Sequence, residues 1–238
     1  MLSILVIGGN GTFGSSIVDS FLEEGHLIKS TYHNPENRRI LPHENYSEIF
    51  LDLTSATLRE ELSFFTEIDV VIVASGLLSL ALMGKIEDED IRESIEVNLI
   101  SNIKICNYFL PVMLKNGFGR IVIIGSTIAD QGSEGGSVYA ASKAGLRGLL
   151  YSASREIKLI KEKKELVADV TINLIEPGPV RGNMLKSFDN EFFENFISNT
   201  PTKQLTSPIE IADTIKLLVK DNSNFNGSVL KIDGGLRM

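Results

Sequence analysis

The chain has 238 residues, of which 43% are hydrophobic and 23% charged, and its net charge at pH 7 is −8. This composition indicates a soluble globular protein that buries a large core, and the length fits one α/β domain. The acidic balance and the lack of a basic stripe argue against a general nucleic-acid binder.

The single cysteine, the three histidines and the length of the apolar runs further limit the class of protein. The single cysteine, Cys106, excludes an intrachain disulfide and lies in an apolar stretch. We therefore expect a buried structural thiol and a reducing compartment, with the cytoplasm as default. His26, His33 and His43 lack metal-ligand spacing, so no metal site is expected. We also expect no signal peptide and no membrane association, since no apolar run approaches the ~20 residues that span a bilayer.

The amino-terminal segment predicts a nucleotide-binding turn. Ser3–Ile7 is a short apolar strand, and residues 15–24 read as a helix. Between them lie Gly8, Asn10, Gly11, Thr12, Phe13 and Gly14. Glycines allow a tight turn and close approach to a diphosphate, and the helix amino terminus offers N–H groups and a positive dipole. The alternative is a plain corner between a strand and a helix.

The end of the second predicted strand, Leu27–Tyr32, bears on the choice of cofactor. In a doubly wound fold, an acidic residue at this point holds the ribose 2′-hydroxyl of NAD. Here Tyr32 and His33 are followed by Arg38 and Arg39. An uncharged and then basic neighbourhood tolerates a 2′-phosphate better, which favours NADP(H) over NAD(H). The alternative is that both arginines simply face solvent.

Two more strands and a long helix follow. A strand over residues 48–51 leads to Asp52, Leu53 and a helix, and a strand over 69–74 ends in small residues, Ala74, Ser75 and Gly76. Small residues there let a ligand lie across the strand end. We expect 86–93 to be an acidic loop before a long helix over about 92–114. Within it, Asn98 is a surface residue, a satisfied core group, or a device that opens the helical hydrogen bonding.

The middle of the chain combines a serine, a tyrosine and a lysine. Ser126 follows an apolar strand over 121–124, and Tyr139 and Lys143 lie on a helix predicted over 138–156. Their spacing places the last two on one helix face. A phenol titrates near ~10, and a neighbouring ammonium lowers that pKa. The set suits proton transfer at a carbonyl or alcohol oxygen, with Ser126 bonding the same oxygen. The alternative is an ordinary amphipathic helix.

The carboxy-terminal part completes the alternation of strands and helices. After a strand over 169–175 we expect a rigid turn over 176–180, which contains Pro177, Gly178 and Val180. Residues 183–200 read as loop or short helix with four phenylalanines that either cover a pocket or pack on the core. A helix over 208–219 and a strand over 227–232 follow. The sequence therefore predicts one domain over 1–238, a doubly wound parallel sheet of the Rossmann type in three α/β/α layers.

With these motifs in this order, the chain resembles the short-chain dehydrogenase/reductase family, single-domain type, over essentially its whole length. The resemblance implies that Tyr139 is the general acid, that Lys143 lowers its pKa and binds the nicotinamide ribose, and that Ser126 orients the substrate oxygen. It implies that Asn98 holds a water for proton relay. It also implies that Asp52 and Leu53 flank the adenine and that residues 177–180 flank the nicotinamide.

Three positions depart from the family pattern. Thr12 stands where a glycine is usual, Ala74 replaces an asparagine, and Gly182 replaces a threonine that holds the carboxamide, a role that Asn183 would have to take over.

The resemblance implies an NADP(H)-dependent carbonyl reductase or alcohol dehydrogenase similar to 3-oxoacyl-carrier-protein reductases, acting on a 3-oxoacyl thioester or another small carbonyl or alcohol. A homodimer or homotetramer is expected. The alternative functions are a non-catalytic nucleotide sensor on the same fold and a structural scaffold.

Overall fold

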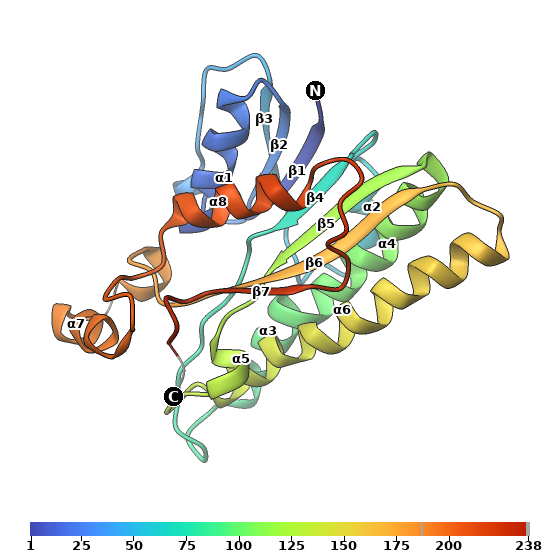
Figure 1. The fold of residues 1–238 in the computed structure, drawn as a ribbon. Helices are drawn as coiled ribbons and strands as arrows, with labels where there is room; N and C mark the ends of the chain where they lie inside the picture. Colours follow the sequence, from blue (N-terminus) through green and yellow to red (C-terminus); the bar gives the residue numbers. More distant parts are fainter. Residues whose placement is uncertain (187, 237–238) are drawn as a thin grey trace.

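The computed structural model describes residues 1–186 and 188–236 and shows a single twisted sheet covered by helices (Figure 1). The strands pair in the order β3-β2-β1-β4-β5-β6-β7, and every pairing is parallel. Their bounds are β1 Ser3–Ile7, β2 Leu27–Tyr32, β3 Tyr46–Phe50, β4 Val70–Val73, β5 Phe118–Ile124, β6 Asp169–Pro177 and β7 Val229–Ile232. The strand order reverses between β1 and β4, where sheets of this kind open a ligand crevice.

Helices cover both faces of the sheet. In Figure 1, α2, α4 and α6 lie on one face, and α1 and α8 lie on the other. The α-helices are α1 Thr12–Glu23, α2 Leu58–Leu62, α3 Asp88–Ile95, α4 Ser101–Asn116, α5 Ile128–Gln131, α6 Ser137–Lys163, α7 Asn190–Asn199 and α8 Pro208–Leu218. A π-helical segment, Glu96–Ile100, joins α3 to α4, and 3₁₀ turns span Pro35–Asn37 and Asn183–Leu185. The predicted three-layer, doubly wound fold is confirmed.

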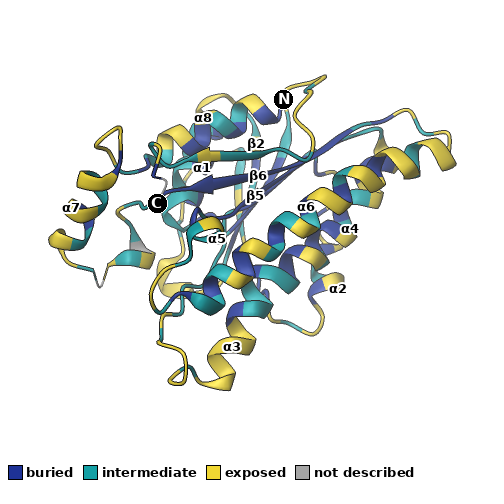
Figure 2. Ribbon diagram, turned by 60° about the horizontal axis from the view of Figure 1, so that its bottom comes forward, coloured by how far each residue is buried: buried dark blue, intermediate teal, exposed yellow. Residues whose placement is uncertain are grey.

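The apolar runs of the strands supply two cores. Successive side chains of a strand point to opposite faces. Leu5 and Ile7 of β1 therefore pack under α2, α4 and α6, whereas Ile4 and Val6 pack under α1 and α8. Figure 2 shows the central strands buried between the two helical layers. Because both faces are covered, these strands read as continuous apolar runs rather than alternating ones.

Several predicted boundaries were wrong, and three of them concern segments that carry or flank predicted site residues. Residues 88–93 of the expected loop over 86–93 are helical, because α3 begins at Asp88, where three acidic side chains in the first turn interact favourably with the positive end of the helix dipole. The helix that carries Tyr139 and Lys143 extends to Lys163. Strand β6 extends to Pro177, which pairs with Ile232 of β7, so the expected turn over 176–180 begins with two strand residues.

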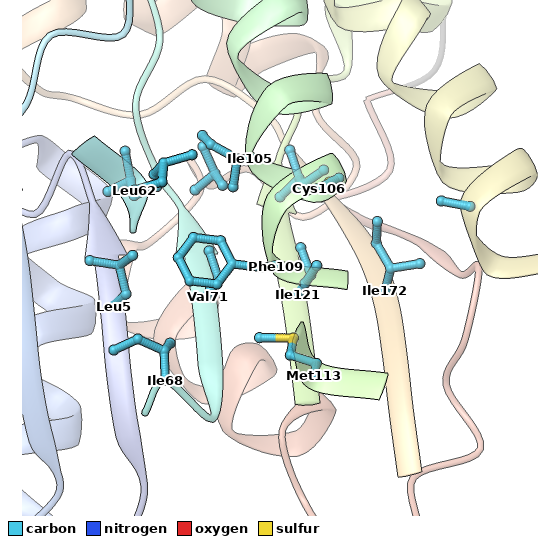
Figure 3. Close-up of a cluster of buried hydrophobic side chains, with 14 of the residues drawn as sticks. Leu5, Leu62, Ile68, Val71, Ile105, Cys106, Phe109, Met113, Ile121 and Ile172 are labelled. Carbon is cyan, nitrogen blue, oxygen red and sulfur yellow. The ribbon is translucent and has the colours of Figure 1, made fainter. Parts of the chain in front are cut away.

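The helical stretch Asp88–Asn116 is, by length and composition alone, apolar enough to cross a membrane, with a window of mean hydropathy 1.2. In this fold the α4 part of the stretch packs in the core. Ile105, Cys106, Phe109 and Met113 of α4 lie buried against the sheet (Figure 3). The prediction that Cys106 is a buried thiol is confirmed, and burial raises its pKa to about 12.

Candidate active site

The predicted site residues gather at one edge of the sheet. Parallel strands bring their carboxyl ends to the same edge, so residues one or two positions after β1 to β6 lie along that edge. These are Gly8, His33, Asp52, Ala74, Ser126 and Gly178. The gathering places the glycine-rich turn, the serine and the turn after β6 at one edge of the sheet.

The glycine-rich turn packs closely against the end of β4. Gly8 adopts a left-handed φ of +82°, and a Cβ built on it would lie 2.8 Å from the backbone nitrogen of Ser75. A Cβ on Gly14 would lie 2.2 Å from the carbonyl oxygen of Gly8. Helix α1 then begins at Thr12, its N-cap residue Gly11 provides no side-chain cap, and its first turn carries no acidic residue. This arrangement fits an anionic diphosphate.

Two buried oxygens beside the turn support a polar ligand. Within the described part of the chain, Ser75 Oγ and Asn10 Oδ1 are buried without a hydrogen-bond partner. The amide nitrogen of Asn10 is engaged, because it donates to the carbonyl of Asn37 at 2.6 Å. Buried polar atoms are normally paired, so the two orphaned oxygens suit ligand hydroxyl or amide groups.

Aromatic and charged side chains surround the ends of β2 and β3. His33 stacks on Phe50 with ring centroids 6.0 Å apart, and its Nε2 lies 4.0 Å from Asp52 Oδ1. Hydrogen bonds from Thr54 hold the pKa of Asp52 below its ordinary value. Arg38 is half-exposed, and its guanidinium lies 5.6 Å from the centroid of the Tyr32 ring.

The sequence predicts that Arg39 helps to bind a 2′-phosphate, but its guanidinium is already bound within the protein. Its guanidinium donates to both carboxylate oxygens of Asp19, at 2.6 and 2.8 Å, and to the carbonyl of Ser15 at 3.1 Å. Arg38 is also paired, since its Nε lies 3.4 Å from Oε2 of the buried Glu48 carboxylate, but its side chain is half-exposed. Of the two arginines that favoured a 2′-phosphate, Arg38 is therefore the more accessible.

Tyr139 and Lys143 lie on the inner face of α6, with exposures of 8% and 3%. Lys143 Nζ donates to the carbonyl of Ile124 at 3.1 Å and lies 5.7 Å from the centroid of the Tyr139 ring. Burial lowers the pKa of Lys143 to about 8. Burial also raises the pKa of Tyr139 to about 12, against the opposing effect of a hydrogen bond with Ser126.

The expected lowering of the Tyr139 pKa is therefore wrong for this structure. The ammonium bonds a backbone carbonyl instead of the phenol, so the loss of hydration dominates. Ser126 opposes the rise in the Tyr139 pKa.

Asn98 is a fully buried group in the π-helical segment, and both ends of its side chain are satisfied. Its Oδ1 accepts from the backbone nitrogen of Leu77 at 2.9 Å, and its Nδ2 donates to the carbonyl of the same residue at 2.8 Å. Asn102 Nδ2 donates to the backbone carbonyl of Asn98 at 3.0 Å. A Cβ on Gly76 would lie 3.4 Å from both Asn98 Oδ1 and Lys143 Nζ, so the loop after β4 meets both predicted catalytic residues.

A network of charged side chains behind the site was missed from the sequence. Arg147 donates to both carboxylate oxygens of Glu176, at 2.7 and 2.5 Å, and the Glu176 side chain is fully buried. Arg147 also contacts Asp130, which in turn contacts Lys231. The network ties together α5, α6, β6 and β7. The available signals were the one-turn spacing of Arg147 from Lys143 and a carboxylate at the end of an apolar strand.

The segment after β6 lies at the same edge of the sheet. Gly178 donates from its backbone nitrogen to the carbonyl of Ile232 at 2.9 Å, and Val180 follows at partial exposure. The phenylalanine-rich part is a helix, α7, which was one of the two predicted alternatives. The side chain of Asn183, proposed to replace the missing threonine, lies outside the described part of the structure.

The fold and the site define a class, a nucleotide-binding oxidoreductase with a Ser-Tyr-Lys centre at the carboxyl edge of a Rossmann sheet. The sequence profile of the short chain dehydrogenase family matches residues 3–191. The chain therefore belongs to the short-chain dehydrogenase family, and the resemblance drawn from its motifs is confirmed.

Individual relatives extend over the whole chain. A 3-oxoacyl-[acyl-carrier-protein] reductase, MabA of Mycobacterium tuberculosis, is 26% identical, with 99% of this chain and 93% of the relative covered. FabG of Escherichia coli, with the same described activity, is 25% identical, with 98% and 96% covered. The solved structure of ElxO with NADP bound matches with a TM-score of 0.85 and 26% identity, covering 99% of each chain.

Proposed function

We propose that this protein is an NADP(H)-dependent ketoreductase that acts on a 3-oxoacyl thioester or a comparable small carbonyl compound. The observation that carries the proposal is the juxtaposition of Ser126, Tyr139 and Lys143 beside the glycine-rich turn. The described activity of the MabA and FabG relatives supports the thioester, and the NADP in the ElxO structure supports the cofactor. A sugar or another small ketone is the second substrate class.

The chemistry of the chain's own residues follows from their protonation. A bound nicotinamide supplies the hydride that reduces the carbonyl carbon. Because burial keeps Tyr139 protonated at neutral pH, its hydroxyl is available as the acid that transfers a proton to the carbonyl oxygen. Ser126 Oγ bonds the same oxygen and orients it. Lys143 is charged below pH about 8 and stabilises the phenolate that remains.

The cofactor would be held along the crevice by residues from four strand ends. The glycine-rich turn and the start of α1 would hold the diphosphate, and Asp52 and Leu53 would flank the adenine. The half-exposed Arg38 and His33 would face the 2′-phosphate. Pro177, Gly178 and Val180 would border the nicotinamide. The half-exposed cation and the lack of an acidic residue directly after β2 favour NADP(H).

A homodimer or homotetramer is part of this proposal. Apolar side chains remain exposed on the outer faces of both long helices, at Ile103 and Val112 of α4 and at Tyr151 and Leu159 of α6. Pairing of these helices between subunits would bury them. Size-exclusion chromatography with light scattering tests this, and a monomer at micromolar concentration would reject it.

The direct test is oxidation of NADPH, and separately NADH, in the presence of a carbonyl panel that includes an acetoacetyl thioester. We expect turnover with NADPH and the thioester, and a lower kcat/KM with NADH. Tight NADPH binding without turnover on any carbonyl would instead support a nucleotide sensor on the same fold.

A further inference from the structure

Two loops that border the crevice meet at a pair of residues, Thr12 and Gly182. Gly182 precedes the 3₁₀ turn Asn183–Leu185, and its backbone is extended, with a φ of −175° and a ψ of −174°. Any residue adopts this conformation, so the backbone gives no reason for a glycine. The reason is space: a Cβ built on Gly182 would lie 2.0 Å from Thr12 Oγ1 and 2.6 Å from Thr12 Cγ2.

Rotation of the threonine side chain does not relieve this contact. The built Cβ also lies 2.7 Å from Thr12 Cβ, an atom whose position does not depend on the rotamer. A side chain at residue 182 therefore requires the backbone of one loop to move. One loop is the glycine-rich turn at the start of α1, and the other is the segment that leaves β6. Gly148 of α6 is a useful contrast, since a Cβ there would meet nothing within 4 Å.

We propose that Thr12 and Gly182 act as one positioning unit, in which the threonine side chain fills the space in front of residue 182 and sets the separation of the two loops. This inference rests on the proposed function, because the two loops are those assigned to the diphosphate and the nicotinamide. In this arrangement the side chain that borders the crevice comes from the glycine-rich turn instead of from residue 182. The glycine at residue 182 and the threonine at residue 12 therefore depend on each other.

A double-mutant cycle tests the unit in two ways. The variants are Gly182→Ala, Thr12→Gly and the double variant, with Gly148→Ala as the matched control for adding a methyl group to a glycine. The first readout is the Tm of each protein without cofactor. The second is the Kd for NADPH, measured from the change in its fluorescence.

We expect Gly182→Ala to lower the Tm by about 5 °C and to raise the Kd about tenfold, because the added methyl group pushes the loops apart. Thr12→Gly should lower the Tm by about 3 °C, since glycine is unfavourable in the first turn of a helix. In the double variant the methyl group finds the vacated space, so its Tm matches or exceeds that of Thr12→Gly. Its Kd returns to within about threefold of the unchanged protein. Gly148→Ala leaves both values unchanged or raises the Tm slightly.

Additive effects in the cycle would overturn the inference, and so would a recovered Tm with no recovery of NADPH binding. If Gly182→Ala gives no folded protein, the inference requires the double variant to fold, and an unfolded double variant contradicts it. Failure of the proposed function is distinguishable, because it appears in the unchanged protein as a lack of NADPH binding. The Tm cycle without cofactor still tests the contact itself.

Discussion

The proposed catalytic centre and the phenylalanine-rich helix α7 are built in different ways. Tyr139, Lys143 and Asn98 are at most 8% exposed and are held by the core elements of the sheet and its covering helices. Helix α7 lies at the margin of the molecule and is mostly exposed (Figures 1 and 2). Of its aromatic side chains, Phe193 is buried, and Phe192 contacts the rings of Phe188 and Phe196 at centroid distances of 4.2 and 4.9 Å.

The contrast indicates that the two regions have different roles, proton transfer at the centre and substrate contact at α7. Proton transfer requires fixed geometry and controlled pKa values, which a buried centre provides. Substrate contact requires a surface that varies without disturbing the fold, which a cluster of rings held mainly by one another provides. We therefore expect substitutions at the centre to alter kcat and substitutions on α7 to alter KM.

Among the changes that separate the centre from α7, Lys143→Met has the largest expected effect. The change removes a buried ammonium and keeps most of the side-chain volume, so the free energy of unfolding should stay the same or rise. Turnover should fall about 10³-fold, because the phenolate loses its stabilising charge. Steady-state kinetics together with thermal denaturation check this. A variant that lost stability while keeping its kcat would mean that Lys143 stabilises the fold and is not needed for turnover.

The network behind the site predicts the next largest effect. Arg147→Met leaves the carboxylate of Glu176 buried without its cation, which should cost about 3 kcal/mol of unfolding free energy. The double variant with Glu176→Gln should recover part of this loss. Chemical denaturation measures both. If Arg147→Met were as stable as the unchanged protein, the ion pair would have no part in holding α6 against β6.

The pKa of Lys143 predicts how stability and the rate of reduction depend on pH. The pKa of Lys143 is lowered from 10.5 to about 8, so from pH 8 to 10.5 the unfolded chain binds the proton that the folded chain has lost. Below pH 8 the buried ammonium lowers the stability of the folded chain by a constant amount. From pH 8 to 10.5 this loss shrinks, so the contribution of Lys143 to stability rises with pH. The rate of reduction should fall above pH about 8, about tenfold per unit, while Tyr139 stays protonated. A profile of kcat/KM from pH 6 to 10 that stays flat would contradict this assignment.

Phe192→Ala predicts the smallest effect. Phe192 lies at the centre of the aromatic cluster and is half-buried, so its loss should raise the KM for the carbonyl compound about fivefold and leave kcat nearly unchanged. Phe225→Ala, a change at a 36% exposed ring that precedes β7 at the opposite, amino-terminal edge of the sheet, is the control and should leave both constants unchanged. A fall in kcat without a change in KM would mean that α7 supports the centre itself.

The fold and the centre were predictable because they depend on local patterns. Apolar strands alternating with helices specify a doubly wound sheet, and a four-residue spacing on a helix places Tyr139 and Lys143 on one face. The glycine-rich turn is recognisable because close backbone approach excludes a Cβ at Gly8 and Gly14.

What the sequence did not reveal depends on contacts between distant segments. The direction of the Tyr139 pKa shift depends on burial and on the carbonyl that engages Lys143. The engagement of Arg39 by Asp19 and the pairing of Arg147 with Glu176 join residues that are about 20 and 29 positions apart. No spacing rule for a single helix or strand covers such separations.

The most direct test of the account is Tyr139→Phe. The control is Tyr151→Phe on the outer face of the same helix, a change that keeps the apolar ring at the proposed subunit interface. Turnover of NADPH with the carbonyl substrate should fall at least 10³-fold in the first variant and stay unchanged in the second. The Kd for NADPH should remain within about twofold in both, because the phenol oxygen contributes its proton rather than the binding energy. Retained turnover in Tyr139→Phe would contradict the assignment of this residue as the proton donor.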